Sequence, residues 1–380
     1  MTSKTQHNHC FICDHKITEA NDSSEHIIIN AIGGRQTVAE FICTDCNNHC
    51  GATWDAALAK QLDPISLYTR VKRQRGKPPA QVFKTSKGQL VRLLPNGDMT
   101  YVKPTIRKTK KENATNIHIQ ANSKKQLKQV IDSYKKKHPN KHIEGNIEQA
   151  NFQKFYSNDP LMFSTQVGGP DGGRSIVKSL VAFAKQQGIP PQHCSTAKQY
   201  LKNISSEPCF GYYYEKDLIL NRPQGHIFHS LCISNKSEKH ILLGYFEIFS
   251  AWRIVACLSD AYNGPDIHAS YSIDPTQGKE LDLDICIPIS KSEIDDIYSN
   301  KKISDGDLEK SLSTMIQVIH KQHFLEQSDK IFEEAFKTAK EKCNVEDESP
   351  LSHEQAMEFS NAVLMECLPF LLQNAHFAKK

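Results

Sequence analysis

Two pairs of cysteines near the start of the chain constrain its fold more than any other feature. Each pair is a Cys-x-x-Cys motif, Cys10 with Cys13 and Cys43 with Cys46. In a zinc knuckle, two thiolates on one tight turn occupy two corners of a tetrahedron around Zn²⁺, and four thiolates complete it without leaving a position for water. The spacing therefore predicts a structural Zn²⁺ bound by all four cysteines.

Other assignments of these cysteines stay open in the sequence. His9, His49 and Cys50 lie close enough along the chain to replace one of the four ligands. Two unrelated redox or core cysteine pairs would also satisfy the pattern. The other seven of the twelve cysteines lie singly, and residues 1–9 carry no apolar stretch typical of an export signal. We therefore expect reduced thiols in a cytoplasmic protein without a membrane span.

Charge is distributed unevenly along the chain. Residues 1–150 contain 24 Lys and Arg against 13 Asp and Glu, a net charge of +11, whereas residues 151–380 contain 23 against 30, a net charge of −7. The excess is concentrated in residues 70–137, which hold 19 basic residues and three acidic ones. Such a density is typical of contacts with nucleic-acid phosphates. The alternative is an ordinary solvated lysine face.

The 380 residues suit more than one domain, and we divide them into four parts. Residues 1–66 contain both cysteine pairs, and residues 67–150 form a basic segment of a β-hairpin and a helix. Residues 151–295 form an α+β domain, and residues 296–380 form a helical tail. Strands and helices come in blocks rather than in strict alternation, which indicates an α+β fold.

Local patterns predict the individual elements. Helices are expected at residues 51–62, 123–137, 176–184, 308–324 and 356–372. In the first of these, Trp54, Leu58 and Leu62 should be buried, and the helix should end near Pro64. Strands are expected in a hairpin of residues 89–94 and 99–103, at residues 116–120, in an antiparallel pair of residues 225–234 and 240–249, and at residues 281–289. Residues 250–259 are so uniformly apolar that a strand and a buried helix both stay open.

A second group of polar residues lies between and just after the cysteine pairs. The sequence reads Ser24-Glu25-His26, then Gly33-Gly34-Arg35, then Cys46-Asn47-Asn48-His49. This combination resembles the HNH endonuclease superfamily, and within it the branch whose ββα-metal finger is stapled by two Cys-x-x-Cys knuckles. The resemblance covers residues 10–62. It implies an N-terminal zinc-stapled finger that hydrolyses phosphodiester bonds with the help of a metal ion.

The resemblance also implies roles for single residues. His26 corresponds to the general base that takes a proton from the attacking water, a task that suits an imidazole. Glu25 and Asn47 correspond to the ligands of one Mg²⁺ or Mn²⁺ ion, which prefers oxygen ligands. The neighbours Asn48 and His49 are alternatives to Asn47 as the ligand.

This chain departs from the family at one position. The central Asn of the family would fall at Thr37 or Val38, so another group must brace the loop of the finger. Asp55 follows Asn47 by two helical turns. It either forms a hydrogen bond to the ligand shell or interacts with the N-terminal end of the helix.

We expect part of the basic residues to contact nucleic acid. The candidates are Arg35, Lys72, Arg73, Arg75, Lys108, Lys110 and Lys111. Their contacts with phosphates would make binding strongly dependent on salt.

Together these features predict a metal-dependent HNH endonuclease that acts on DNA, with RNA left open as a substrate. A homodimer would let two fingers cut two strands. The first alternative is a zinc module that only binds nucleic acid, but a pure binder needs no base beside a metal ligand, which is what Glu25, His26 and Asn47 would supply. The second alternative assigns residues 151–380 to sensing a partner or ligand, with the nuclease as effector. That arrangement fits an anti-phage defence system by analogy.

Overall fold

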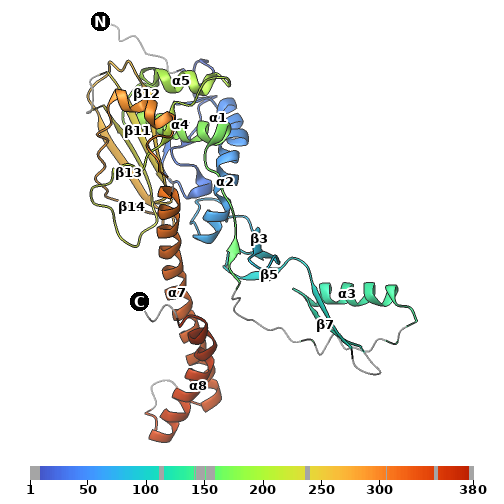
Figure 1. The fold of residues 1–380 in the computed structure, drawn as a ribbon. Helices are drawn as coiled ribbons and strands as arrows, with labels where there is room; N and C mark the ends of the chain where they lie inside the picture. Colours follow the sequence, from blue (N-terminus) through green and yellow to red (C-terminus); the bar gives the residue numbers. More distant parts are fainter. Residues whose placement is uncertain are drawn as a thin grey trace. The chain divides into compact units, whose positions relative to one another are not determined.

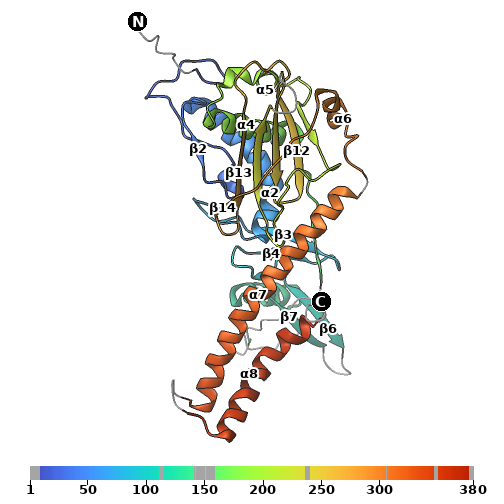
Figure 2. The same ribbon diagram turned by 90° about the vertical axis from the view of Figure 1, so that its left-hand side faces the viewer.

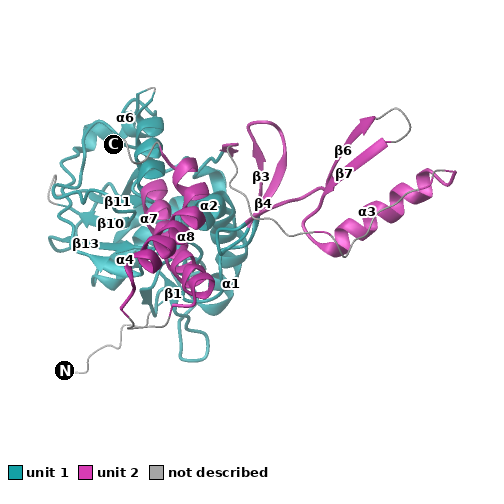
Figure 3. Ribbon diagram, turned by 90° about the horizontal axis from the view of Figure 1, so that it is seen from below, with its two compact units in different colours: residues 1–81, 94–98, 164–318 teal, residues 82–93, 99–163, 319–380 magenta. Residues whose placement is uncertain are grey.

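The computed structural model describes residues 9–110, 115–140, 142, 150, 159–235, 240–304, 306–345 and 350–375. It divides into two compact units, shown in different colours in Figure 3. The first contains residues 1–81, 94–98 and 164–318, and the second contains residues 82–93, 99–163 and 319–380. Helices and strands occur in blocks, so the predicted α+β class is confirmed. The division into four parts stays a prediction.

The N-terminal finger in the first unit begins with a very short hairpin. β1 (Glu25–His26) pairs antiparallel with β2 (Thr37–Val38), and His26 lies opposite Thr37. The 3-10 helix η1 (Asn30–Ile32) lies in the connection between them. The two family positions that lack the central Asn are therefore the two residues of β2.

Two glycines make the connection possible. Gly33 follows η1 with a φ of 95°, a left-handed conformation that a side chain disfavours. A Cβ atom on Gly34 would lie 1.6 Å from the carbonyl oxygen of Ile28. The backbone approaches itself so closely here that only glycine fits.

One long helical segment follows the hairpin. α1 (Thr44–Cys50), the π-helical turn η2 (Gly51–Asp55) and α2 (Ala56–Tyr68) succeed one another without a break. The predicted apolar stripe of this helix is confirmed, because Trp54, Leu58 and Leu62 are all buried.

The predicted end of this helix near Pro64 is wrong. Pro64 lies inside α2, which continues to Tyr68. A proline in a helix interior removes one backbone hydrogen bond. However, Ile65 and Leu67 continue the buried face beyond it, and their burial favours another helical turn.

A six-stranded antiparallel sheet forms the core of the first unit. Its strands, in spatial order, are β14 (Lys279–Leu281), β13 (His268–Asp274), β10 (His229–Ser234), β11 (Leu242–Ile248), β12 (Trp252–Ser259) and β9 (Phe210–Tyr212). The predicted antiparallel pair is confirmed as β10 and β11. Residues 236–239 of its connecting turn lie outside the described residues. The undecided run of residues 250–259 is resolved as the strand β12.

The predicted strand at residues 281–289 is wrong over most of its length. Only Leu281 belongs to a strand, and Ile285 forms an isolated bridge with Ile219. Leu283, Ile285, Ile287 and Ile289 are nevertheless buried in the apolar cluster of the sheet. The alternation that suggested a strand is therefore real, but it reports burial of every second residue and not pairing.

Helix α4 (Gly169–Gln186) lies between this sheet and the helical segment of the finger (Figure 1). It contacts α2 and η2 on one side and β10, β11 and β12 on the other. Every residue from Gly172 to Ala184 is buried. The predicted helix at residues 176–184 is thus confirmed, and it joins the finger to the sheet.

Shorter elements complete the first unit. They are η4 (Pro191–His193), α5 (Ser195–Lys202), η5 (Lys291–Glu293) and α6 (Ile294–Tyr298). α5 packs against α4 and β12.

The second unit contains most of the basic segment, namely residues 82–93 and 99–150. A sheet has the order β5 (Met99–Tyr101), β4 (Leu90–Leu93), β3 (Gln81–Thr85) and β8 (Leu161–Met162). A separate hairpin consists of β6 (Thr105–Lys110) and β7 (Thr115–Gln120), and α3 (Lys124–Lys137) follows it. The hairpin of β4 and β5, the strand β7 and the helix α3 were all predicted and are confirmed, whereas the pairing of β7 with β6 was not foreseen.

The helical tail is confirmed as well. α7 (Asp307–Cys343) extends well beyond the predicted residues 308–324, and α8 (His353–Gln373) begins with the predicted capping box of Ser352 and Gln355. Figure 2 shows α8 alongside the later part of α7, where the rings of Phe336 and Phe359 lie 5.5 Å apart. Within the described residues, none of the helices combines the length and apolar character needed to span a membrane.

Candidate nuclease site

The four cysteines of the two Cys-x-x-Cys pairs converge. The Sγ atoms of Cys10, Cys13, Cys43 and Cys46 all lie within 4.8 Å of one another. Cys10 and Cys13 lie on a turn closed by a hydrogen bond from the Cys10 amide to the carbonyl of His15 (2.8 Å). Cys43 and Cys46 lie at the start of α1. This arrangement fits a structural Zn²⁺ with four thiolate ligands.

The thiols of the cluster differ in their pKa: burial raises the pKa of Cys13 and Cys46, whereas the pKa of Cys10 is lowered. Burial of Cys10 would raise its pKa, but backbone N–H groups of Cys13 and Cys43 point at its sulfur and lower the pKa overall. The alternative ligands His9, His49 and Cys50 do not belong to the cluster among the residues that the structure describes.

The residues predicted for catalysis share one pocket. Glu25 and His26 from β1 and Asn47 from α1 line an open cavity of about 380 Å³, together with Asp55 from η2 and Arg75. The predicted base and the two predicted metal ligands thus face the same space. His49 is exposed and does not line the cavity, so the geometry favours Asn47 over it.

A buried lysine lies behind this pocket. Lys178 in α4 is fully enclosed, and its ammonium contacts Oε1 of Glu25 and, at 2.7 Å, Oδ2 of Asp55. Ser175, one turn earlier in α4, donates a hydrogen bond of 2.6 Å to Oδ1 of Asp55. Asp55 therefore does not cap a helix, because the segment from α1 to α2 is continuous and α4 holds its carboxylate.

Burial and charge act against each other in this cluster. Burial raises the pKa of Glu25, while the Lys178 ammonium works against the rise. Burial alone would lower the pKa of Lys178, but the carboxylates of Asp55 and Glu25 outweigh it and raise the pKa. Lys178 is therefore held in its charged form.

Sequence reasoning missed Lys178 because it is 153 positions away from Glu25. No local signal marked it, because Lys178 shares one side of the helix with Arg174, Ser175 and Ser179. Such a polar stripe is typical of the solvent-exposed side of an amphipathic helix.

The loop of the finger is braced by residues from beyond α2. Oδ1 of Asn30 accepts hydrogen bonds from the backbone amides of Gln74 (2.9 Å) and Arg75 (3.4 Å). The side chain of Gln74 lies between His26 and Arg35. Its Oε1 is 3.1 Å from Nε2 of His26, and its Nε2 donates to the carbonyl oxygen of Arg35 at 3.1 Å. These contacts supply the brace that the missing central Asn left unassigned. Nothing in the pattern around Gln74 marked it for this task.

The residues predicted to contact nucleic acid differ in their exposure and in the protein groups that they contact. Arg75 lines the pocket, and Lys72, Lys108 and Lys110 are exposed. Arg73 forms an ion pair of 2.9 Å with Asp63.

Two further candidates differ from these. Arg35 is packed closely over Gly278, where a Cβ atom would lie 2.0 Å from its guanidinium. Lys111 lies outside the described residues. Arg73 thus already has an ionic partner and Arg35 is packed against the chain at Gly278, whereas Arg75 lines the pocket.

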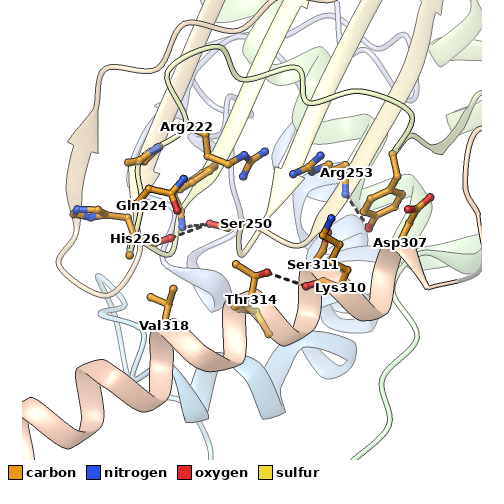
Figure 4. Close-up of a pocket in the computed structure, with 15 residues that line it drawn as sticks. Arg222, Gln224, His226, Ser250, Arg253, Asp307, Lys310, Ser311, Thr314 and Val318 are labelled. Carbon is orange, nitrogen blue, oxygen red and sulfur yellow. Dashed lines mark hydrogen bonds between the residues drawn. The ribbon is translucent and has the colours of Figure 1, made fainter. Parts of the chain in front are cut away.

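A second pocket of about 310 Å³ lies beside the sheet and the first turns of α7 (Figure 4). Arg222 and Arg253 line it, but carboxylates of the protein already match their charges. Arg222 pairs with Glu247 at 2.8 Å and with Asp217, and Arg253 lies 3.5 Å from Asp217.

Comparison with known proteins agrees with this geometry. Residues 10–63 match a family model described as HNH endonuclease. The match covers almost the same residues as the resemblance seen in the sequence, and the cysteine cluster lies inside it. No curated protein and no solved structure matches the chain.

The chain therefore carries an N-terminal HNH domain with a cluster of four cysteines. At the level of the family this is a nuclease-type enzyme domain whose ligand is nucleic acid.

Proposed function

We propose that the chain is a metal-dependent endonuclease that hydrolyses phosphodiester bonds of DNA at the pocket of Glu25, His26 and Asn47. The observation that carries the proposal is the convergence of these three side chains on one cavity, inside the segment that matches the HNH family. The cytoplasmic location, the homodimer and the role in antiviral defence remain predictions from the sequence.

The donor set of the pocket fits a hard divalent cation. Glu25 offers a carboxylate oxygen and Asn47 an amide oxygen, which are ligand types that Mg²⁺ and Mn²⁺ prefer. Lys178 contacts Oε1 of Glu25, which leaves Oε2 for a ligand in the pocket. When bound there, the ion would stabilise the negative charge that develops on the phosphate and on the leaving oxygen.

Gln74 determines how His26 would act as the base. Its Nε2 donates to the carbonyl of Arg35, which can only accept, so the other atom of the amide, Oε1, faces His26. In neutral His26, Nε2 must then carry the proton and Nδ1 the free lone pair. A water molecule gives its proton to Nδ1 while its oxygen attacks phosphorus, and the bond from phosphorus to the leaving oxygen breaks.

Two groups of basic residues support nucleic acid as the substrate. Arg75 lines the pocket, where its guanidinium can contact a phosphate beside the one that is cut. Lys108 and Lys110 are exposed on the same side of β6, because alternate residues of a strand share a face. We assign both groups to contacts with the phosphate backbone rather than with bases.

The test is an assay of purified protein on plasmid, single-stranded DNA and RNA, each with Mg²⁺, with Mn²⁺ and with a chelator. We expect cleavage of DNA that requires the divalent ion. Cleavage of RNA alone would correct the substrate. Binding to nucleic acid without cleavage under any condition would instead support the non-catalytic zinc module.

A further inference from the structure

The cluster of Glu25, Lys178 and Asp55 links the HNH finger to a helix far outside the matched segment. Lys178 is 0 % exposed and Glu25 is 3 % exposed. Both carboxylates line the pocket of the predicted catalytic residues, and the ammonium of Lys178 lies behind them. The finger alone supplies neither the cation nor the serine that hold its acidic residues.

An enclosed ammonium loses its hydration, and its partners must offset the desolvation free energy. The rest of α4 is packed between the finger and the sheet with apolar side chains such as Val177 and Val181. An apolar residue at position 178 would avoid that cost, but it would leave the carboxylates of Glu25 and Asp55 without the cation. Because its ammonium contacts two carboxylates, we infer that Lys178 holds these carboxylates in place.

Asp55 is itself fixed from a second direction. Ser175 donates to Oδ1 of Asp55, and Lys178 contacts Oδ2. Asp55 therefore anchors the ammonium on one side, and Glu25 is held on the other. Ser175 and Lys178 both lie in α4, whose far side packs on the sheet.

We propose that Lys178 is a positioning residue of the nuclease site, which holds Oε1 of Glu25 so that Oε2 faces the pocket. This inference rests on the proposed function. It also makes α4 a part of the site, because a displacement of α4 would displace a metal ligand of the finger.

A competing account gives Lys178 only the task of neutralising two buried acids. The two accounts predict opposite orders of kcat and of Mn²⁺ affinity for a pair of variants. Asp55→Asn keeps the contact of Lys178 with Glu25, although it leaves the cluster one negative charge short. The double variant Lys178→Met/Asp55→Asn removes one cation and one anion, so the net charge of the cluster is that of the wild type.

The experiment measures kcat, KM for DNA and the dissociation constant for Mn²⁺, the last by calorimetry without nucleic acid. If Lys178 positions Glu25, kcat of the double variant should be at least about 30-fold below that of Asp55→Asn, as for other residues that orient metal ligands. KM should be unchanged, and Mn²⁺ should bind about tenfold more weakly to the double variant, although charge alone would favour binding there.

Zinc content and melting temperature establish that both variants are folded. Lys178→Arg keeps the cation and should retain part of kcat and of Mn²⁺ affinity. Ser179→Ala, at a buried serine of the same helix whose hydroxyl donates to the backbone carbonyl of Ser175, is the control and should leave both close to the wild-type values. A double variant that equals or exceeds Asp55→Asn in both kcat and Mn²⁺ affinity would overturn the inference. If the wild type cuts no nucleic acid, the proposed function fails, and the order of Mn²⁺ affinities still decides the role of Lys178.

Discussion

Oε1 of Gln74 lies 3.1 Å from Nε2 of His26, across 48 positions of the chain. The backbone amide of Gln74 donates to the side chain of Asn30, and the side-chain amide of Gln74 donates to the carbonyl oxygen of Arg35. A residue outside the matched segment thus fixes the ring of the predicted base. Lys178 of α4 lies behind the same pocket and contacts Glu25, so two residues that support the site come from beyond residue 63.

Gln74→Leu tests the first of these supports. Loss of the acceptor for Nε2–H should lower kcat by about 10- to 100-fold with little change in KM for DNA, because the ring loses its fixed orientation. Gln74→Glu keeps an acceptor oxygen and should retain more activity than Gln74→Leu. Gln277→Leu, at an exposed glutamine whose backbone amide is bonded to Asp274, is the matched control. Equal rates for Gln74→Leu and this control would remove Gln74 from the mechanism.

Cys43→Ser tests the zinc site. Removal of one thiolate should release Zn²⁺ and unfold the finger locally, because metal binding supplies folding free energy to a segment this small. Metal analysis and hydrogen exchange over residues 10–63 measure both effects. Cys286→Ser changes an exposed cysteine outside the cluster and should leave both unchanged. A Cys43→Ser protein with a full complement of zinc would show that the tetrad is assigned wrongly.

Lys108→Gln/Lys110→Gln tests the basic strand β6. Lys110 is exposed, and the ammonium of Lys108 lies 4.8 Å from the ring centroid of Tyr134. If both lysines bind phosphates, affinity should fall about equally for all DNA sequences. The slope of log affinity against log salt should decrease by about 0.9 for each phosphate that is no longer bound by a lysine. An unchanged slope would identify the lysines as a solvated face.

We expect the buried His229 to lower the free energy of unfolding of the protein in acid. This histidine is completely buried as the neutral form: Phe249 N–H donates to Nδ1 at 3.0 Å, and Nε2–H donates to the carbonyl of Ile32 at 2.9 Å. Burial lowers its pKa from 6.5 to about 4. Between these pH values the unfolded chain binds a proton that the folded protein does not, so stability falls as pH falls.

The decrease due to this one residue should reach up to about 3 kcal/mol of unfolding free energy at a pH near 4. Urea unfolding of the wild type and of His229→Gln at neutral and acidic pH measures it. The variant should be less stable at neutral pH and should depend less on pH. Parallel pH curves for the two proteins would assign the acid sensitivity to other groups.

The sequence predicted the parts of the site that are local in the chain. The four cysteines, Glu25, His26 and Asn47 all lie between positions 10 and 47, and knuckle spacing and the Gly-Gly turn bring them together. Ser352 and Gln355 likewise identified the start of α8 from one turn of sequence.

Features that depend on distant partners could not be predicted in this way. Lys178 and Gln74 contact Glu25 and His26 only through tertiary packing, and no local sequence pattern encodes these contacts. Pro64 was expected to end a helix, but the core that buries Ile65 and Leu67 overrides local propensity. Residues 281–289 alternate like a strand, yet whether an alternating segment is paired depends on the elements beside it.

Cleavage of plasmid DNA in Mn²⁺ by the wild type and by His26→Ala tests the central claim most directly. His26 lines the pocket, and its ring is hydrogen-bonded to the exposed side chain of Gln74 rather than packed in the core, so its removal should affect chemistry far more than packing. We predict cleavage by the wild type and a rate at least about 100-fold lower for His26→Ala, with zinc content and melting temperature nearly unchanged. A folded, zinc-replete His26→Ala protein that cuts at the wild-type rate would contradict the account.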